Sequence, residues 1–153
     1  MNPVPAARPA PVSDSLIERL SEQHRQVETL VAGVTEALAH NRLARSRELL
    51  ISIRSALLGH LALEDLELYP ALIVAAQRAG LREEEQLART FATNMERISQ
   101  QLKEFFARHT SHHADSAALK HEFPSMLKAL AARIQSEETM LYPLYTKLCV
   151  TRR

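Results

Sequence analysis

HLALEDLELYP at residues 60–70 and RIQSEETMLYP at residues 133–143 are two copies of one motif, and they decide the fold. In each copy the fifth residue is a glutamate, Glu64 or Glu137, the sixth is an acid, and the last three are Leu-Tyr-Pro. Each glutamate falls on the stripe of apolar residues that marks the inner face of a helix. The repeat therefore predicts two helices that each bring one carboxylate into a shared core.

Apolar residues recur at helical spacing on both sides of the two copies, in four long segments of the chain. Helices of this length joined by short loops favour antiparallel neighbours. The predicted fold is all-α, an antiparallel up-down-up-down four-helix bundle. We expect its helices to run over about residues 14–38, from beyond Asn41 to near Gly80 with a kink at Pro70, over about 83–109, and from a start between Ser116 and Pro124 to about 148.

The composition supports one helical domain. The chain has 153 residues, 46% of them hydrophobic and 24% charged, which suits a single globular core. It has only three glycines, and four of its seven prolines come before residue 12, so little is left for hairpin turns. We expect residues 1–13 to be a disordered Pro/Ala-rich tail, residues 14–148 to be the bundle, and residues 149–153 to be a C-terminal tail.

Charge and cysteine content exclude several classes of function. A net charge of +1 gives no electrostatic reason to expect nucleic acid as a partner. The longest apolar run, Ala71–Ala76, is too short to cross a bilayer, and the N-terminus lacks the apolar region of a secretory signal. The single cysteine, Cys149, fits a reducing compartment, so we expect a cytoplasmic protein. No nucleophile with a base and no phosphate loop is recognisable, and we do not expect an enzyme.

Several polar residues interrupt the apolar stripes, and the helix lengths place them at about the same level of the bundle. His60 and Glu64 are four residues apart, so they share a helix face and can bind one metal ion. Two buried glutamates suit iron or manganese, because carboxylates bridge hard cations. The polar positions are His24, His60, Glu64, Asn94 and Glu137, with Arg133 at the edge of the stripe.

The motif and its Leu-Tyr-Pro endings resemble those of the hemerythrin and HHE cation-binding family, over roughly residues 14–146. The resemblance implies a four-helix bundle with His24, His60, Glu64 and Glu137 as metal ligands. It also implies iron as the cofactor, in a mononuclear or a di-iron centre. Members of that family bind oxygen, sense oxygen or nitric oxide, or handle iron.

The sequence departs from the family pattern at two ligand positions, where Asn94 and Arg133 replace histidines. Asparagine is a weak ligand for iron, and a guanidinium cannot be a ligand at all. We therefore expect a degenerate site with one metal ion or none, in which Arg133 pairs with Glu64 and Glu137 in place of a cation. Simpler interpretations are a buried amide at position 94, a surface arginine at position 133 and a metal-free His–Glu pair in the core.

A weaker resemblance points to another function. The stretches Ser99–Phe106 and Ala129–Glu138, together with Gly59 and His60, are similar to the Rsd/AlgQ family. That resemblance implies a metal-free regulator that binds the primary sigma factor. The sequence thus leaves two functions open, a metal-binding sensor or regulatory module and a metal-free protein-binding regulator. It leaves the oligomeric state open as well.

Overall fold

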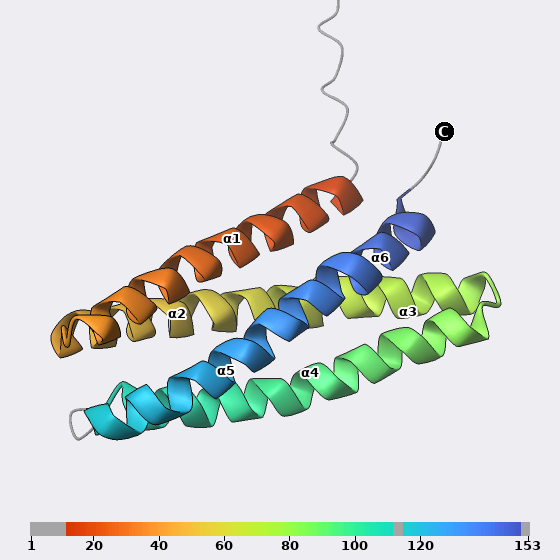
Figure 1. Cartoon of the computed structure of the whole chain (residues 1–153). Helices are drawn as coiled ribbons and strands as arrows, with labels where there is room; N and C mark the ends of the chain where they lie inside the picture. The colour runs from red at the N-terminus through yellow and green to blue at the C-terminus, as the bar shows by residue number, and fades with distance from the viewer. Residues whose placement is uncertain (1–11, 112–114, 151–153) are drawn as a thin grey trace, which may run out of the picture.

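The computed structural model describes residues 12–111 and 115–150, and every secondary-structure element in these ranges is helical. The elements form four long rods that run antiparallel to one another, as Figure 1 shows. The predicted all-α four-helix bundle is confirmed. The first rod is α1 (Val12–Ala39), the second is α2 (Leu43–Leu63), η1 (Glu64–Leu68) and α3 (Tyr69–Arg78), the third is α4 (Arg82–His109), and the fourth is α5 (Ser116–Ser136), η2 (Glu137–Leu141) and α6 (Tyr142–Cys149).

Two sharp turns connect the first three rods. Asn41 adopts a left-handed backbone conformation with a φ of 54°, and Gly80 does the same with a φ of 69°. After each of them a backbone N–H reaches back to an unpaired carbonyl of the preceding helix, from Arg42 to Ala37 at 2.8 Å and from Leu81 to Ala76 at 2.9 Å. This arrangement is a common helix ending, which favours glycine or asparagine at the left-handed residue. The helix breaks predicted at Asn41 and Gly80 are therefore confirmed.

The ends of the bundle differ slightly from the prediction. Helix α1 already includes Val12 and Ser13, whereas residues 1–11 of the predicted tail lie outside the described residues. Cys149 is the last residue of α6, and residues 151–153 also lie outside them. Helix α5 begins at Ser116, with the Asp115 side chain accepting a hydrogen bond from the first turn, so Pro124 lies inside the helix rather than in its first turn.

The second and fourth rods each contain one π-helical turn, and both turns begin at the glutamate of the repeated motif. The backbone N–H of Tyr69 bonds to the carbonyl of Glu64, and that of Tyr142 bonds to the carbonyl of Glu137. The next residue in each rod is a proline, whose ring would clash with a carbonyl of a regular helix and which has no N–H to donate. A widened turn before the proline relieves this clash without breaking the rod.

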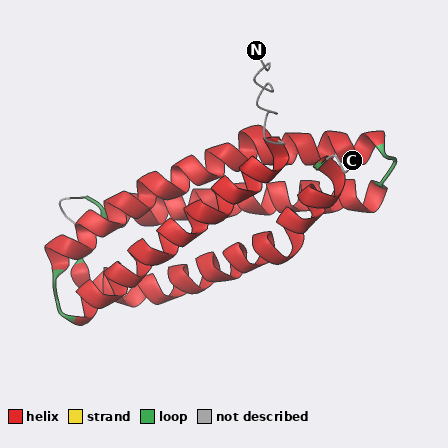
Figure 2. Cartoon of the chain, turned by 90° about the horizontal axis from the view of Figure 1, so that it is seen from above, coloured by secondary structure: helices red, strands yellow, loops and turns green. Residues whose placement is uncertain are grey.

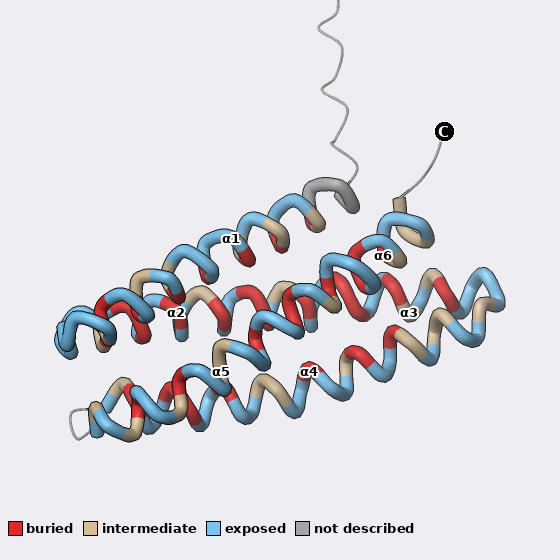
Figure 3. The backbone as a smooth tube through the Cα atoms, in the orientation of Figure 1, coloured by how far each residue is buried: buried red, intermediate tan, exposed pale blue. Residues whose placement is uncertain are grey.

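Buried residues recur along every rod, as Figure 3 shows, and the apolar ones among them form one core cluster. The view in Figure 2 shows the same rods from above, with loops only at the two ends of the bundle. Within this core the largest fully buried side chains are apolar, apart from Glu64 and Glu137. Each helix in the described part of the chain is too short or too polar to span a bilayer.

Candidate metal centre

Four of the predicted ligands meet in the middle of the bundle. His24 comes from α1, His60 from α2, Glu64 from η1 and Glu137 from η2. Their exposed fractions are 2%, 3%, 0% and 1%, respectively. Ionisable groups are rarely buried to this extent unless they pair with one another or with a metal ion.

The ligand atoms of His24, His60 and Glu137 converge on one point, and the Glu64 carboxylate lies against His60. The two Nε2 atoms of His24 and His60 are 3.1 Å apart. Glu137 Oε1 lies 3.5 Å from Nε2 of His24 and 3.6 Å from Nε2 of His60, and Glu64 Oε1 lies 3.3 Å from Nε2 of His60. Ligand atoms of His24, His60 and Glu137 all lie within 4.8 Å of one another, so this group could hold a metal ion.

The other ring nitrogen of each histidine has its own hydrogen-bond partner. His24 Nδ1 lies 2.9 Å from Glu138 Oε1, and His60 Nδ1 lies 2.8 Å from Gln23 Oε1. These oxygens accept the Nδ1 protons, which leaves a lone pair on each Nε2 in the neutral imidazoles. The 3.1 Å between the two Nε2 atoms is a hydrogen-bond distance if one of them carries a proton, and a cation bound by both nitrogens could take the place of that proton.

Two carboxylate oxygens of the centre are also unsatisfied. Among the described residues, Glu64 Oε1 and Glu137 Oε2 are buried without a hydrogen-bond partner. A buried acceptor without a partner is unusual and destabilising. Two imidazole nitrogens with two carboxylates make a donor set that suits a divalent transition-metal ion. The residues present therefore fit a metal ion.

When no metal ion is bound, protons on the side chains of the centre supply part of the positive charge that the metal would bring. Burial lowers the pKa of His60, but the nearby carboxylates of Glu137 and Glu64 outweigh this effect and raise the pKa to about 9. Burial raises the pKa of Glu64 to about 8. For Glu137, burial is outweighed by hydrogen bonds from His24 and His60, which lower its pKa. The two buried carboxylates thus need positive charge beside them, which protons supply when no metal ion does.

Arg133 is buried, with 9% of its surface exposed, but its contacts differ from the prediction. Its Nη2 donates to the carbonyl of Phe91 at 3.0 Å and to the hydroxyl of Tyr69 at 3.4 Å, and its guanidinium lies 4.8 Å from the Phe91 ring centre. No carboxylate of the described residues forms an ion pair with it. The predicted pairing of Arg133 with Glu64 and Glu137 is wrong, because the side chain reaches across to α4 instead.

The predicted position of Asn94 on the inner face of the third helix is also wrong. Asn94 is exposed, whereas its neighbour Met95 is 2% exposed and lines the cavity beside the centre. Positions 94 and 95 both suit helical spacing after Phe91, and burying the apolar Met95 costs less than burying an amide. Among the described buried residues of α4, His109 alone could bind a metal, and it pairs instead with Glu122 at 2.6 Å.

Three residues that the sequence did not single out complete the centre. The Tyr142 hydroxyl donates to Glu64 Oε2 at 3.3 Å and lies 3.2 Å from His24 Nε2, with its ring stacked on His24. Glu138 and Gln23 orient the two histidines. The repeat contained the signal for two of them, because Glu138 is the acid at its sixth place and Tyr142 belongs to its Leu-Tyr-Pro ending.

Comparison with protein-family models agrees with this arrangement, whereas searches of curated proteins and of solved structures found no match. The sequence model of the hemerythrin HHE cation-binding domain matches residues 15–145, which cover most of the four rods and every residue of the centre. The chain therefore belongs to the hemerythrin HHE cation-binding domain family.

Proposed function

We propose that this protein binds a single iron ion through His24, His60, Glu64 and Glu137, and that it works as a sensor or regulatory module. The observation that carries the proposal is the facing pair of Nε2 atoms, 3.1 Å apart, with both Nδ1 atoms already hydrogen-bonded. An arrangement of this kind orients neutral imidazoles as metal ligands.

The described side chains around the centre support one ion rather than two. A di-iron centre in a bundle takes ligands from all four helices. Here α4 presents Met95 and Phe91 to the interior, and the fourth rod presents Arg133 one turn before Glu137. A fixed positive charge and a thioether at these positions disfavour a second iron ion.

The chain's own residues determine what the centre can do. Bound iron would supply a Lewis-acidic, redox-active atom. Glu138 and Gln23 hold the histidines in one tautomer, and the Tyr142 hydroxyl holds Glu64 through its Oε2. Among the described residues, no nucleophile with a base lies beside these groups. This favours sensing or regulation over catalysis.

Iron titration of the metal-free protein tests the proposal. Anaerobic calorimetry with ferrous iron should give one binding event, and His60→Ala or Glu137→Gln should weaken it about tenfold or more. His109→Ala is the matched control, because His109 is as buried as His60 but lies outside the centre. No uptake by the parent protein, or equal binding by the His60 and His109 variants, would overturn the proposal.

The metal-free alternative remains a prediction with its own test. A regulator of the Rsd/AlgQ kind should retain the primary sigma factor from a bacterial lysate when immobilised. Retention of that subunit by both the parent and the Glu137→Gln variant would support a metal-independent role for the bundle. Failure to retain it from the parent would count against the alternative.

A further inference from the structure

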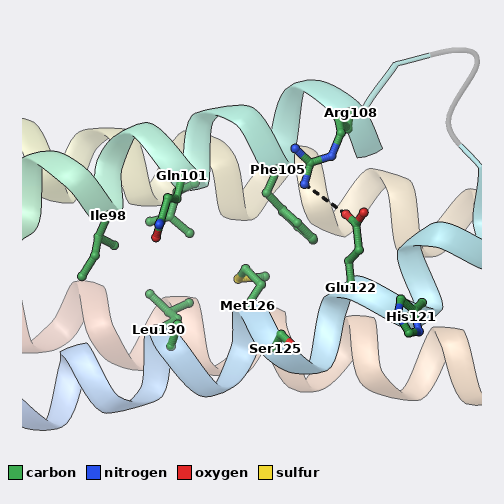
Figure 4. Close-up of a pocket in the computed structure, with 11 residues that line it drawn as sticks. Ile98, Gln101, Phe105, Arg108, His121, Glu122, Ser125, Met126 and Leu130 are labelled. Carbon is green, nitrogen blue, oxygen red and sulfur yellow. Dashed lines mark hydrogen bonds and ion pairs between the residues drawn. The ribbon is translucent and has the colours of Figure 1, made fainter.

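A groove of about 390 Å³ lies between α4 and α5, close to the centre but outside it. Figure 4 shows Ile98 of α4 facing Leu130 and Met126 of α5 across the groove. An ion pair between Arg108 and Glu122, 3.0 Å long, joins the two helices at one end. Apolar side chains thus line much of the groove, with the Arg108–Glu122 ion pair at one end and the amide of Gln101 near Ile98 at the other.

The floor of this groove is also a wall of the metal centre. A small cavity of about 10 Å³ lies against His24, His60 and Glu137, and three of its lining residues also line the groove. The three shared residues are Ile98, Leu102 and Leu130. A second, smaller groove of about 320 Å³ between α2 and α4 also borders the inner cavity, through Leu57, Leu61 and Leu102. A single layer of aliphatic side chains thus separates the inner cavity from the groove.

We propose that the α4–α5 groove is the route by which small uncharged molecules reach the metal centre, with Ile98, Leu102 and Leu130 as the partition they must pass. This proposal rests on the proposed function, because a route to the centre matters only if the centre binds iron. A purely aliphatic partition rejects ions, because they would have to lose their hydration shells. The inner cavity of about 10 Å³ has room for about one water-sized probe, so the route favours the smallest uncharged molecules.

The opposite side of the centre has a different character. Glu138, which holds His24, has a side chain that is 43% exposed, and Gln23, which holds His60, is half-buried. On this side, the partly exposed polar side chains of Glu138 and Gln23 give metal ions and charged chelators a polar path to the centre. The two sides would therefore admit different classes of molecule, and this difference makes the route through Leu102 testable.

Dissolved oxygen under pressure is a suitable probe, because it is uncharged and paramagnetic and it broadens the NMR signals of nearby methyl groups whether or not iron is bound. The route predicts strong broadening of the Met126 methyl in the groove and of the Met95 methyl in the inner cavity. Leu50 and Leu72 are equally buried methyl-bearing controls away from both spaces. If oxygen broadens the Met95 methyl signal of the unmodified protein no more than the signals of these controls, the proposal is overturned.

Blocking the partition gives the second readout. Leu102→Phe or Leu130→Phe should remove much of the broadening at Met95 and leave that at Met126. Leu127→Phe is the matched control, since Leu127 packs on the core from α5 but does not line the groove. Chelator removal of iron should proceed at the parent rate in all three variants. Unchanged broadening of the Met95 signal in both blocking variants would contradict the route. So would a chelation rate that falls in these variants as much as the broadening does. Neither result depends on whether the protein senses or regulates.

Discussion

The two histidines of the centre are held by different kinds of oxygen. A carboxylate, Glu138, accepts the Nδ1 proton of His24, whereas an amide, Gln23, accepts that of His60. A carboxylate partner makes an imidazole a stronger ligand than a neutral partner does, because it stabilises the positive charge that the ring acquires on binding a cation. Glu138 should therefore contribute to metal affinity although it is not itself a ligand.

Glu138→Gln tests this contribution with little change of shape. We expect iron affinity to fall by about 10–100-fold, measured by competition with a chromogenic chelator. Asp65→Asn is the control, because Asp65 holds the same place in the first copy of the motif but is exposed and touches neither histidine. Equal affinities for the Glu138 variant and the parent would show that the hydrogen bond to His24 has no effect on binding.

The inward position on α4 can be tested by building a second metal site. Met95→His combined with Arg133→His places two imidazoles on the interior face beside Glu137, and iron uptake should rise from one ion per chain towards two. Asn94→His combined with Arg133→His is the control, because Asn94 is exposed. If the Asn94 pair gains iron and the Met95 pair does not, the helix is rotated relative to the structure described above.

Residue-scale prediction from sequence succeeded where the motif was distinctive. His60 with Glu64, and Glu137 in the second copy, were predictable because a polar residue on an apolar stripe needs a partner. Asn94 was misplaced because helical spacing alone does not separate neighbouring positions. The partners of Arg133 were not predictable either, since a long side chain can reach more than one acceptor and only packing selects among them.

At the scale of helices, the two π-helical turns set which residues face inward after each glutamate. Leu68 and Tyr69 are adjacent in sequence and both are buried, and the same holds for Leu141 and Tyr142. In each turn the tyrosine N–H bonds to the carbonyl of the glutamate five residues earlier, so the tyrosine lies over that glutamate. The extra residue in each turn therefore brings the tyrosine inward, and in the second copy this places Tyr142 beside His24.

A pair of substitutions in the first π-helical turn tests this register. Leu68→Ala should lower the free energy of unfolding by about 2–5 kcal/mol, because Leu68 is completely buried. Leu66→Ala should change it by no more than about 0.5 kcal/mol, because Leu66 is 77% exposed. Urea unfolding measures both values. Similar losses for the two variants would mean that this turn does not have the described register.

The helices themselves were predictable, but these turns were not. Apolar spacing, the breaks at Asn41 and Gly80 and the scarcity of glycine determine four rods. A proline in a helical pattern predicts a kink, as it did at Pro70, without saying how the chain absorbs it. The π-helical turn depends on the packing of Leu68 and Tyr69 against other rods, which the local sequence does not contain.

For the whole molecule, the ligands of the centre come from three of the four rods, so metal binding should couple to folding. An ion that binds the folded chain alone stabilises it, by about 2.7 kcal/mol when its free concentration is 100 times Kd. Removing iron with a chelator should therefore lower the Tm of the parent protein. The chelator should lower the Tm of the His60→Ala variant less than that of the parent, and an equal effect on both would place the stabilising metal elsewhere.

The central claim, that the bundle holds one iron ion at His24, His60, Glu64 and Glu137, is tested most directly by counting metal. Protein produced with adequate iron and purified without chelators should contain about one iron ion per chain by elemental analysis, and the Glu137→Gln variant should contain much less. Two ions per chain, or less than roughly a tenth of an equivalent of iron in the parent, would contradict the claim.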